Sequence, residues 1–382
     1  MTPEKLLFAL LRIAVCGGEP GQEIREACTP EALEQVYTLA RRHDLAHLAG
    51  HALSALTLPE SEALKALRQA AAVAVFRHMR FDHELKQICD TLNRAGIDFI
   101  PLKGAVIRDL YPAPWMRTSG DIDVLVRRED LERAAAALAQ ELSYTADEEM
   151  NYHDLLLVAP DGVHVELHFS LRENMENIDR LLDRVWDHAV PAEGSRYALA
   201  DEFLAFHLIA HMSYHFANGG CGIRPILDVF LLMRHRRVDE AVLRDYLSQC
   251  SIETFYDHVQ ELIGVWFGDR TATPITDMMT RFILDGGTYG SAMQRQAVAQ
   301  EREGGKVRYL LSRVFMPYER MKRKYPVLQT CPILFPLMQV RRWVELFFGG
   351  RFKRAVSEVR RSKQIDRNEA EDISCLLRQL GL

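Results

Sequence analysis

The sequence lacks several features that would place it in a familiar class. Its seven cysteines are scattered along 382 residues and form no Cys-x-x-Cys pair, which excludes a zinc ribbon and a thioredoxin-type redox site. No run reaches the ~18 apolar residues that a membrane-spanning helix needs. Arg12 interrupts the apolar run at residues 6–16, which argues against a secretory signal. We therefore expect reduced thiols, no stable membrane insertion and a cytoplasmic location.

Three motifs of nucleotide and metal sites are also absent. The chain has no Gly-x-x-x-x-Gly-Lys-Ser/Thr, no Gly-x-Gly-x-x-Gly and no His-Glu-x-x-His segment, so P-loop, dinucleotide-binding and zincin functions lack their signature residues. The composition, 48% hydrophobic and 26% charged, is that of a globular protein and excludes a disordered or collagen-like chain. The length favours two or three domains.

Charge is distributed unevenly. The basic stretch, residues 302–363, has 16 Lys or Arg against four Asp or Glu, although the whole chain carries a net charge of -6. Basic side chains with interleaved aromatics can follow a nucleic-acid backbone and stack on bases, but they also form solvated helix faces or bind acidic partners. Both interpretations stay open, and the pI near 6.2 argues against a dedicated nucleic-acid binder.

Apolar periodicity predicts an α+β fold. Helical patterns fill the first part of the chain and return after Pro191, whereas strand and helix patterns alternate between them. An Asp-Gly turn at Asp161-Gly162 joins two of the strand patterns into a hairpin. The predicted strands are 97–100, 121–126, 154–158 and 163–171. We expect a mixed-sheet core at 79–192 between a helical N-terminal region at 1–78 and a helical C-terminal domain at 193–382.

Two carboxylates on one predicted strand form the strongest candidate site. Side chains alternate across a strand, so Asp121 and Asp123 point to the same face. Adjacent carboxylates repel each other unless a cation neutralises them. Hard oxygen ligands of this kind suit Mg²⁺, which binds a few carboxylates, water and substrate phosphates. A solvent-exposed strand edge would show the same Asp-x-Asp pattern, so the neighbouring residues have to distinguish a metal site from an exposed edge.

A possible phosphate-binding turn precedes the acidic strand. Gly104 follows a predicted strand and opens the predicted helix 105–110, and such junctions expose unpaired backbone N–H groups. Lys103 adjoins it as a mobile positive charge. Arg117 and Ser119 lie between the turn and the acidic pair, and we expect all four residues to bind the nucleotide. A phosphate-binding turn before two carboxylates suits metal-assisted phosphoryl transfer.

A third carboxylate follows on the predicted hairpin. His164, Glu166 and His168 share one face of its second strand. Two-metal transfer needs a third acid, which completes the site of the nucleophile, and Glu166 is suitably placed. The histidines also fit a partly buried polar strand face, which is the interpretation that we prefer.

These residues together resemble the uncharacterised nucleotidyltransferases of the polymerase-beta-like superfamily. The resemblance rests on Lys103-Gly104, Arg117, Asp121-Ile122-Asp123 and residues 164–168, and it extends to His211, His215 and Asp228. It covers residues 80–240 well and the ends weakly. It implies that Asp121, Asp123 and Glu166 bind the metals. The superfamily has Gly-Ser or Gly-Gly at the phosphate turn, whereas this chain has Lys-Gly and therefore no serine hydroxyl there.

A histidine-bearing helix is a possible acceptor wall. His207, His211 and His215 follow at intervals of four residues and stack on one helix face. One straight helix cannot surround a cation with all three, so a polar face packed on the sheet is the simpler interpretation. Asp228 would pair with one of them or with an arginine. His168, His211, His215 and Asp228 are the candidate acceptor-site residues.

The sequence thus predicts a Mg²⁺-dependent (or Mn²⁺-dependent) enzyme that moves a nucleotidyl group from an NTP, with ATP as the expected donor. Asp121, Asp123 and Glu166 are its expected catalytic and metal-binding residues. The acceptor could be a small molecule, a peptide or an RNA. Two alternatives remain open: a nucleotide-binding regulatory module that has lost turnover, and a toxin-like enzyme that modifies tRNA or protein.

Overall fold

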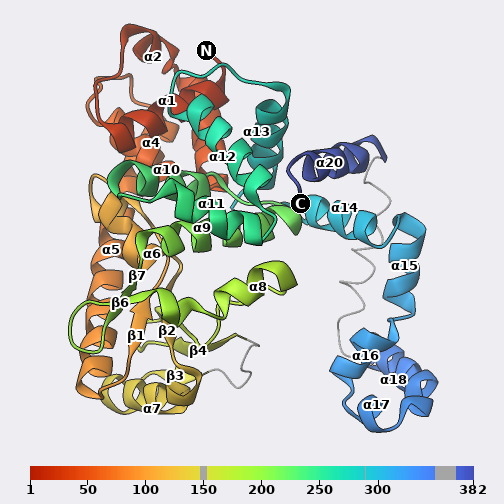
Figure 1. The fold of residues 1–382 in the computed structure, drawn as a ribbon. Helices are drawn as coiled ribbons and strands as arrows, with labels where there is room; N and C mark the ends of the chain where they lie inside the picture. The colour runs from red at the N-terminus through yellow and green to blue at the C-terminus, as the bar shows by residue number, and fades with distance from the viewer. Residues whose placement is uncertain (147–152, 289, 349–366) are drawn as a thin grey trace.

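The computed structural model describes residues 1–146, 153–288, 290–348 and 367–382. Helices from both halves of the chain form one body in the upper part of Figure 1, and the sheet lies below helix α9. The first helices are α1 (Pro3–Cys16), α2 (Gln22–Ala27), α3 (Pro30–Arg42), α4 (Ala46–Leu53) and α5 (Glu62–Arg94). The helices between and after the strands are α6 (Gly104–Ile107), α7 (Leu131–Leu142) and α8 (Glu176–Leu182).

From Asp201 onward, all regular elements in the described residues are helices. The α-helices among them are α9 (Asp201–Ala217), α10 (Ile223–His235), α11 (Glu240–Gln249), α12 (Glu253–Trp266), α13 (Pro274–Gly286), α14 (Ala292–Arg302), α15 (Lys306–Val314), α16 (Tyr318–Lys324), α17 (Val327–Thr330), α18 (Phe335–Phe348) and α20 (Arg367–Gln379). In the described part of the chain, no helix is both long and apolar enough to cross a bilayer.

The described residues contain seven strands in two sheets, which confirms the predicted α+β class. The strands are β1 (Phe99–Pro101), β2 (Asp121–Val126), β3 (Thr145–Ala146), β4 (Asp154–Val158), β5 (His164–His168), β6 (Ala189–Pro191) and β7 (Tyr197–Leu199). The larger sheet has the order β1-β2-β5-β4-β3, and β6 pairs with β7. β2 runs parallel to β5, whereas the pairs β1–β2 and β4–β5 are antiparallel. The sheet is therefore mixed, as the sequence predicts.

Local signals account for several element boundaries. Thr29 accepts a hydrogen bond from the Ala32 backbone N–H (3.3 Å) and begins α3. In the β4–β5 hairpin, Asp161 Oδ1 accepts from the Val163 N–H (3.0 Å), and Gly162 has a positive φ of 88° that side chains disfavour. The strand predicted at 163–171 is shorter than expected and ends at His168.

Helix α5 joins the helical body to the sheet. Ser61 caps its start through a 3.2 Å hydrogen bond from the Leu64 N–H, and the helix runs for 33 residues without interruption. The boundary expected at residue 78 thus falls within one continuous helix. Its first half packs on α3 and α4, and its second half packs on α7 beside the sheet. The division into three regions remains a prediction.

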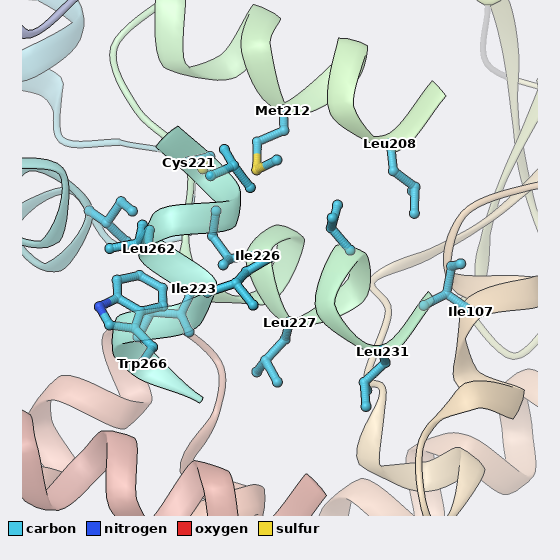
Figure 2. Packing of buried hydrophobic residues seen from close by; sticks show 14 of the residues in the cluster. Ile107, Leu208, Met212, Cys221, Ile223, Ile226, Leu227, Leu231, Leu262 and Trp266 are labelled. Atoms are coloured by element: carbon cyan, nitrogen blue, oxygen red, sulfur yellow. The ribbon is translucent and has the colours of Figure 1, made fainter. Parts of the chain in front are cut away.

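Two large apolar cores hold the sheet between them. Ile122, Val124 and Val126 of β2 pack with α5 and α7 in one core, whereas Leu125 points to the opposite face and joins the core of the helical body. Figure 2 shows part of that body, in which side chains from α6, α9, α10 and α12 meet: Ile107, Leu208, Met212, Leu227, Leu231 and Trp266. The sheet face of Leu125, which also carries Asp121 and Asp123, is therefore directed toward the helical body.

The basic stretch lies mainly on helices α15 to α18, at the right of Figure 1 and away from the sheet. Its residues 349–363 lie outside the part of the chain that the structure describes. A small core of Met321, Tyr325, Leu328 and Met338 holds helices α16, α17 and α18 together.

Candidate active site

The pairing of two parallel strands brings the three candidate acids together. The register of β2 and β5 places Asp123 opposite Glu166 and Leu125 opposite His168. One ligand atom each from Asp123, Glu166 and His168 lie within 4.8 Å of one another. Asp121 lies two residues before Asp123 on β2, so both side chains point to the same face of the sheet. The acidic strand and the hairpin strand thus meet as the sequence predicts.

The environment shifts the pKa values of the two aspartates in opposite directions. Burial, with repulsion from Asp123 and Glu166, raises the pKa of Asp121 to about 6. Burial also acts to raise the pKa of Asp123, but Lys103 and His168 outweigh it and hold this pKa well below its usual value. Asp123 is therefore firmly ionised, whereas Asp121 carries an unfavourable charge that a cation would relieve.

Asp123 has two cationic or hydrogen-bonding partners. Lys103 Nζ lies 3.3 Å and His168 Nε2 lies 2.9 Å from Asp123 Oδ1. His168 Nε2 also lies 3.3 Å from Glu166 Oε2. Burial acts to lower the pKa of His168, but hydrogen bonds to Asp123 and Glu166 reverse this and raise it. His168 lies almost wholly buried beneath the carboxylates and holds them in place.

The turn at Lys103-Gly104 is strained and tightly enclosed. Lys103 has a φ of 42°, which costs a side-chain-bearing residue on the order of 1–3 kcal/mol. A Cβ atom at position 104 would lie 2.1 Å from Ser119 Oγ, so any side chain there would displace the Ser119 hydroxyl from its present position. The hydroxyl that the Lys-Gly turn lacks is thus present beside it, supplied by Ser119. Because α6 has only four residues, its dipole contributes little, and Lys103 is the main positive charge at the turn.

An ion pair anchors the segment between the turn and β2. Arg117 Nε and Nη2 donate to the carboxylate of Asp228 at 3.0 and 2.9 Å, and Tyr111 Oη donates to Asp228 Oδ1 at 2.8 Å. Arg117 Nη1 also donates to Ser119 Oγ at 3.1 Å. Asp228 on α10 therefore pairs with an arginine rather than with a histidine. Because Arg117 bonds both residues, Asp228 positions the Ser119 hydroxyl through Arg117.

A cavity of about 300 Å³ opens between the sheet and helices α9 and α10. Its lining contains nearly all of the predicted site residues: Lys103, Gly104, Arg117, Ser119, Asp121, Asp123, Glu166, His211, His215 and Asp228. His168 does not belong to the lining, because it lies behind Asp123, and His207 is also buried away from the cavity. The tertiary structure thus gathers one acidic wall and one histidine wall around a single space.

The histidine wall is organised by Glu173, a residue that the sequence patterns do not mark. Glu173 Oε1 lies 2.5 Å from His211 Nδ1, and His211 Nε2 lies 3.1 Å from His215 Nε2. A carboxylate only accepts, so His211 Nδ1 donates to it and His211 Nε2 accepts from His215. Burial lowers the pKa of His215 to about 3 and that of His211 well below its usual value, so both rings are neutral near pH 7.

Arg224 is a second residue that sequence analysis missed. It lines the cavity from the first turn of α10 and forms an ion pair with Asp44 at 2.5 Å. Its spacing of four residues from Asp228 places both side chains on one face of the helix, and this spacing is a signal that could have found it. Glu173 lies in the segment between β5 and α8 and has no such periodic signal.

Comparison with known proteins agrees with this geometry. The model of a family described as uncharacterised nucleotidyltransferases matches residues 29–268, a range that contains the acidic strand, the hairpin and helices α9 and α10. No curated protein and no solved structure matches the chain. The protein therefore belongs to the uncharacterised nucleotidyltransferases, transferases that move a nucleotidyl group.

Proposed function

We propose that the protein transfers an NMP group from an NTP, with ATP as the expected donor, to an acceptor held between the sheet and α9. The acceptor oxygen attacks the α-phosphorus, and pyrophosphate leaves. The observation that carries the proposal is the meeting of Asp121, Asp123 and Glu166 with Lys103 around one cavity. The expected place of action is the cytoplasm.

The acidic wall suits a hard divalent cation. Asp121, Asp123 and Glu166 offer carboxylate oxygens, and burial with repulsion from Asp123 and Glu166 raises the pKa of Asp121, a cost that a bound cation would relieve. Mg²⁺, or Mn²⁺, would be held by these three residues and would neutralise charge on the transferred phosphoryl group. Glu166 has a partly exposed side chain that reaches the cavity, which suits its proposed place beside the nucleophile.

The turn at Lys103-Gly104, which adjoins Asp123, suits the phosphates of the nucleotide. Burial acts to lower the pKa of Lys103, but Asp123 and Glu173 outweigh it and raise this pKa, so the ammonium group stays charged. The lack of a Cβ at Gly104 leaves room for Ser119 Oγ beside the turn. Lys103 and Ser119 would bind phosphate oxygens by charge and hydrogen bond. Arg117 would act mainly through Ser119, because Asp228 occupies most of its guanidinium.

Glu173, His211 and His215 would orient the acceptor. Glu173 fixes the tautomer and direction of His211, and His211 in turn orients His215 through the bond between their Nε2 atoms. In the neutral ring of His215, Nδ1 is the acceptor nitrogen that suits a hydroxyl. The cavity is small, at about 300 Å³, which admits one group of the acceptor at a time. A small molecule, a peptide side chain or an RNA end would all present such a group.

A transfer assay tests the proposal. The full chain is incubated with each labelled NTP, Mg²⁺ and panels of small-molecule, peptide and RNA acceptors, and pyrophosphate release and label transfer are measured. Label transfer that disappears in Asp121→Asn supports the assignment. Mg²⁺-dependent NTP binding without transfer to any class of acceptor would favour a regulatory binding module, and transfer to tRNA or protein alone would favour the toxin-like alternative.

A further inference from the structure

Helices α15 to α18 form a small module outside the main body. Residues 306–348, which we call the C-terminal module, follow α14 and lie apart from helices α9 to α13 in Figure 1. Arg342 joins α18 to the end of α15, because its Nη1 donates to the Val314 carbonyl oxygen at 3.1 Å. Trp343 Nε1 donates to the same oxygen at 2.8 Å. These bonds fix the two helices relative to each other.

The C-terminal module exposes large apolar side chains on both of these helices. Leu311 and Val314 on α15 are three residues apart, and those on α18 recur at intervals of three or four, so those on each helix share one face. Phe315 directly follows α15. Phe315 and Trp343 join the two faces, with ring centroids 5.5 Å apart. About half of each side chain is in solvent, for example 55% for Phe315 and 58% for Leu337. The apolar face consists of Leu311, Val314, Phe315, Leu337, Val340 and Val344.

The helices that carry the apolar face also carry exposed positive charge. Residues 302–348 contain ten Lys or Arg and three Glu. Arg308 and Arg313 on α15 and Arg341 on α18 are exposed on the same helices that carry the apolar side chains. A soluble monomer seldom exposes such a group of apolar side chains unless a partner covers it. The basic surroundings indicate that this partner is negatively charged.

We propose that the apolar face docks the C-terminal module on the surface of an anionic lipid bilayer. Apolar side chains that enter the headgroup region, flanked by Arg and Lys, are the pattern of interfacial membrane binding. The helices, of nine and 14 residues, are too short to span a bilayer, so they would lie in its surface. Membrane docking is independent of the transfer chemistry proposed above.

Two features favour a lipid surface over RNA. Most of the exposed apolar side chains are aliphatic, and these gain little from nucleotide bases, whereas they enter lipid readily. Among the aromatics interleaved with the basic residues, Tyr309 and Tyr325 are buried, and Trp343 packs its ring on Phe315. No stacking platform for bases is therefore formed by these three rings.

Vesicle flotation of the full chain tests this inference. We expect binding to vesicles of phosphatidylcholine with phosphatidylglycerol, weaker binding at high salt, and at least about tenfold weaker binding to pure phosphatidylcholine. The triple variant Leu311→Ser/Phe315→Ser/Val344→Ser should lose binding about tenfold or more. Arg308→Gln/Arg313→Gln should weaken binding to the anionic vesicles only. All five positions are exposed, so the variants should fold, which circular dichroism checks.

The matched control is Phe76→Ser/Met79→Ser. These residues are equally apolar and are 62% and 65% exposed, but they lie on α5, so the control should bind vesicles as the wild type does. Absence of binding to anionic vesicles overturns the inference, as does equal loss in the control. A wild-type dimer that becomes a monomer in the triple variant, without vesicle binding, would instead identify the apolar face as an interface between copies. RNA binding without vesicle binding also overturns it.

Discussion

Lys103 Nζ lies 3.3 Å from Asp123 Oδ1, and this largely buried pair connects the phosphate turn to the acidic strand. The backbone supports the same connection, because the Leu102 N–H donates to the Asp123 carbonyl oxygen at 3.0 Å. Lys103 holds its side chain there from a strained positive φ, and strain of this kind persists where the surrounding structure enforces it. The pair makes Asp123 a structural as well as a candidate catalytic residue, whereas Asp121 lacks such a partner among the described ion pairs.

The first prediction is that the two aspartates affect stability in opposite directions. Asp123→Asn leaves Lys103 and His168 without their anionic partner, and we expect a loss of about 3–5 kcal/mol in the free energy of unfolding. Asp121→Asn removes a charge that burial and its neighbours disfavour, so without metal it should raise this free energy, by on the order of 1 kcal/mol. Denaturant unfolding in EDTA measures both, and equal losses in the two variants would contradict the assignment.

The second prediction concerns metal dependence. If Asp121 and Asp123 bind Mg²⁺, calorimetry should show NTP binding that depends on divalent ion and weakens at least about tenfold in Asp121→Asn. Because this variant should fold well, a binding loss reflects the site rather than the fold. The control is Asp109→Asn, an exposed aspartate outside the cavity. NTP affinity that is equal with and without Mg²⁺, in wild type and variant alike, would refute the metal site.

The third prediction separates chemistry from binding. Glu166→Gln should keep NTP affinity within about tenfold, roughly 1.4 kcal/mol, because two carboxylates and Lys103 remain. Its transfer rate should fall on the order of 10² or more if Glu166 serves the nucleophile. Single-turnover transfer of labelled nucleotide gives the rate. A variant as fast as the wild type would make Glu166 a structural residue.

The fourth prediction addresses the acceptor wall. Glu173→Ala removes the acceptor of the His211 Nδ1–H bond, so we expect the KM for the acceptor to rise about tenfold or more, with the KM for NTP unchanged. Glu173→Gln is the matched variant, because its amide oxygen can still accept this bond, and it should retain most of the activity. A rise in the KM for NTP alone would place Glu173 on the nucleotide side.

The fifth prediction concerns pH and stability. Burial lowers the pKa of His43 and of His47 to about 4, from an ordinary value of 6.5. The unfolded chain therefore binds more protons between about pH 6.5 and 4, so the free energy of unfolding falls as pH decreases through this window and is retained above it. Each histidine contributes at most about 1.4 kcal/mol per pH unit to the slope of the free energy of unfolding against pH.

Denaturant unfolding at several pH values measures this slope. The variant His47→Gln keeps a donor for the Met116 carbonyl oxygen, which His47 Nε2 contacts at 2.8 Å, but it cannot titrate. Its slope should be shallower than that of the wild type by the contribution of one histidine. Identical slopes would mean that the titration of His47 does not control stability.

Much of the local structure followed from the sequence. The strands at 121–126 and 154–158 and the helix at 131–142 begin and end where apolar periodicity predicts. Alternation along a strand is a property of the chain itself, so the shared face of Asp121 and Asp123 needed no tertiary information. The Asp-Gly turn likewise predicted the hairpin that carries Glu166.

Elsewhere packing overrides local signals. The sequence pattern changes near residue 78, but α5 continues through this position, because its first half packs on α3 and α4 and its second half packs on α7. The helix expected at 105–110 is a single α-helical turn followed by a 3₁₀ turn.

The sequence by itself determined which residues could act, and the tertiary structure decided which of them meet. Parallel pairing of β2 with β5 sets Glu166 opposite Asp123, a choice that depends on the cores packed on both faces of the sheet. Packing of α9 and α10 over the sheet brings His211 and Asp228 to residues about a hundred positions earlier, and it places His211 against Glu173 from the segment between β5 and α8. It also buries His168 under the acids and places Ser119 Oγ against Gly104. Such contacts arise from long-range burial of apolar faces, which the periodicity of any single segment does not encode.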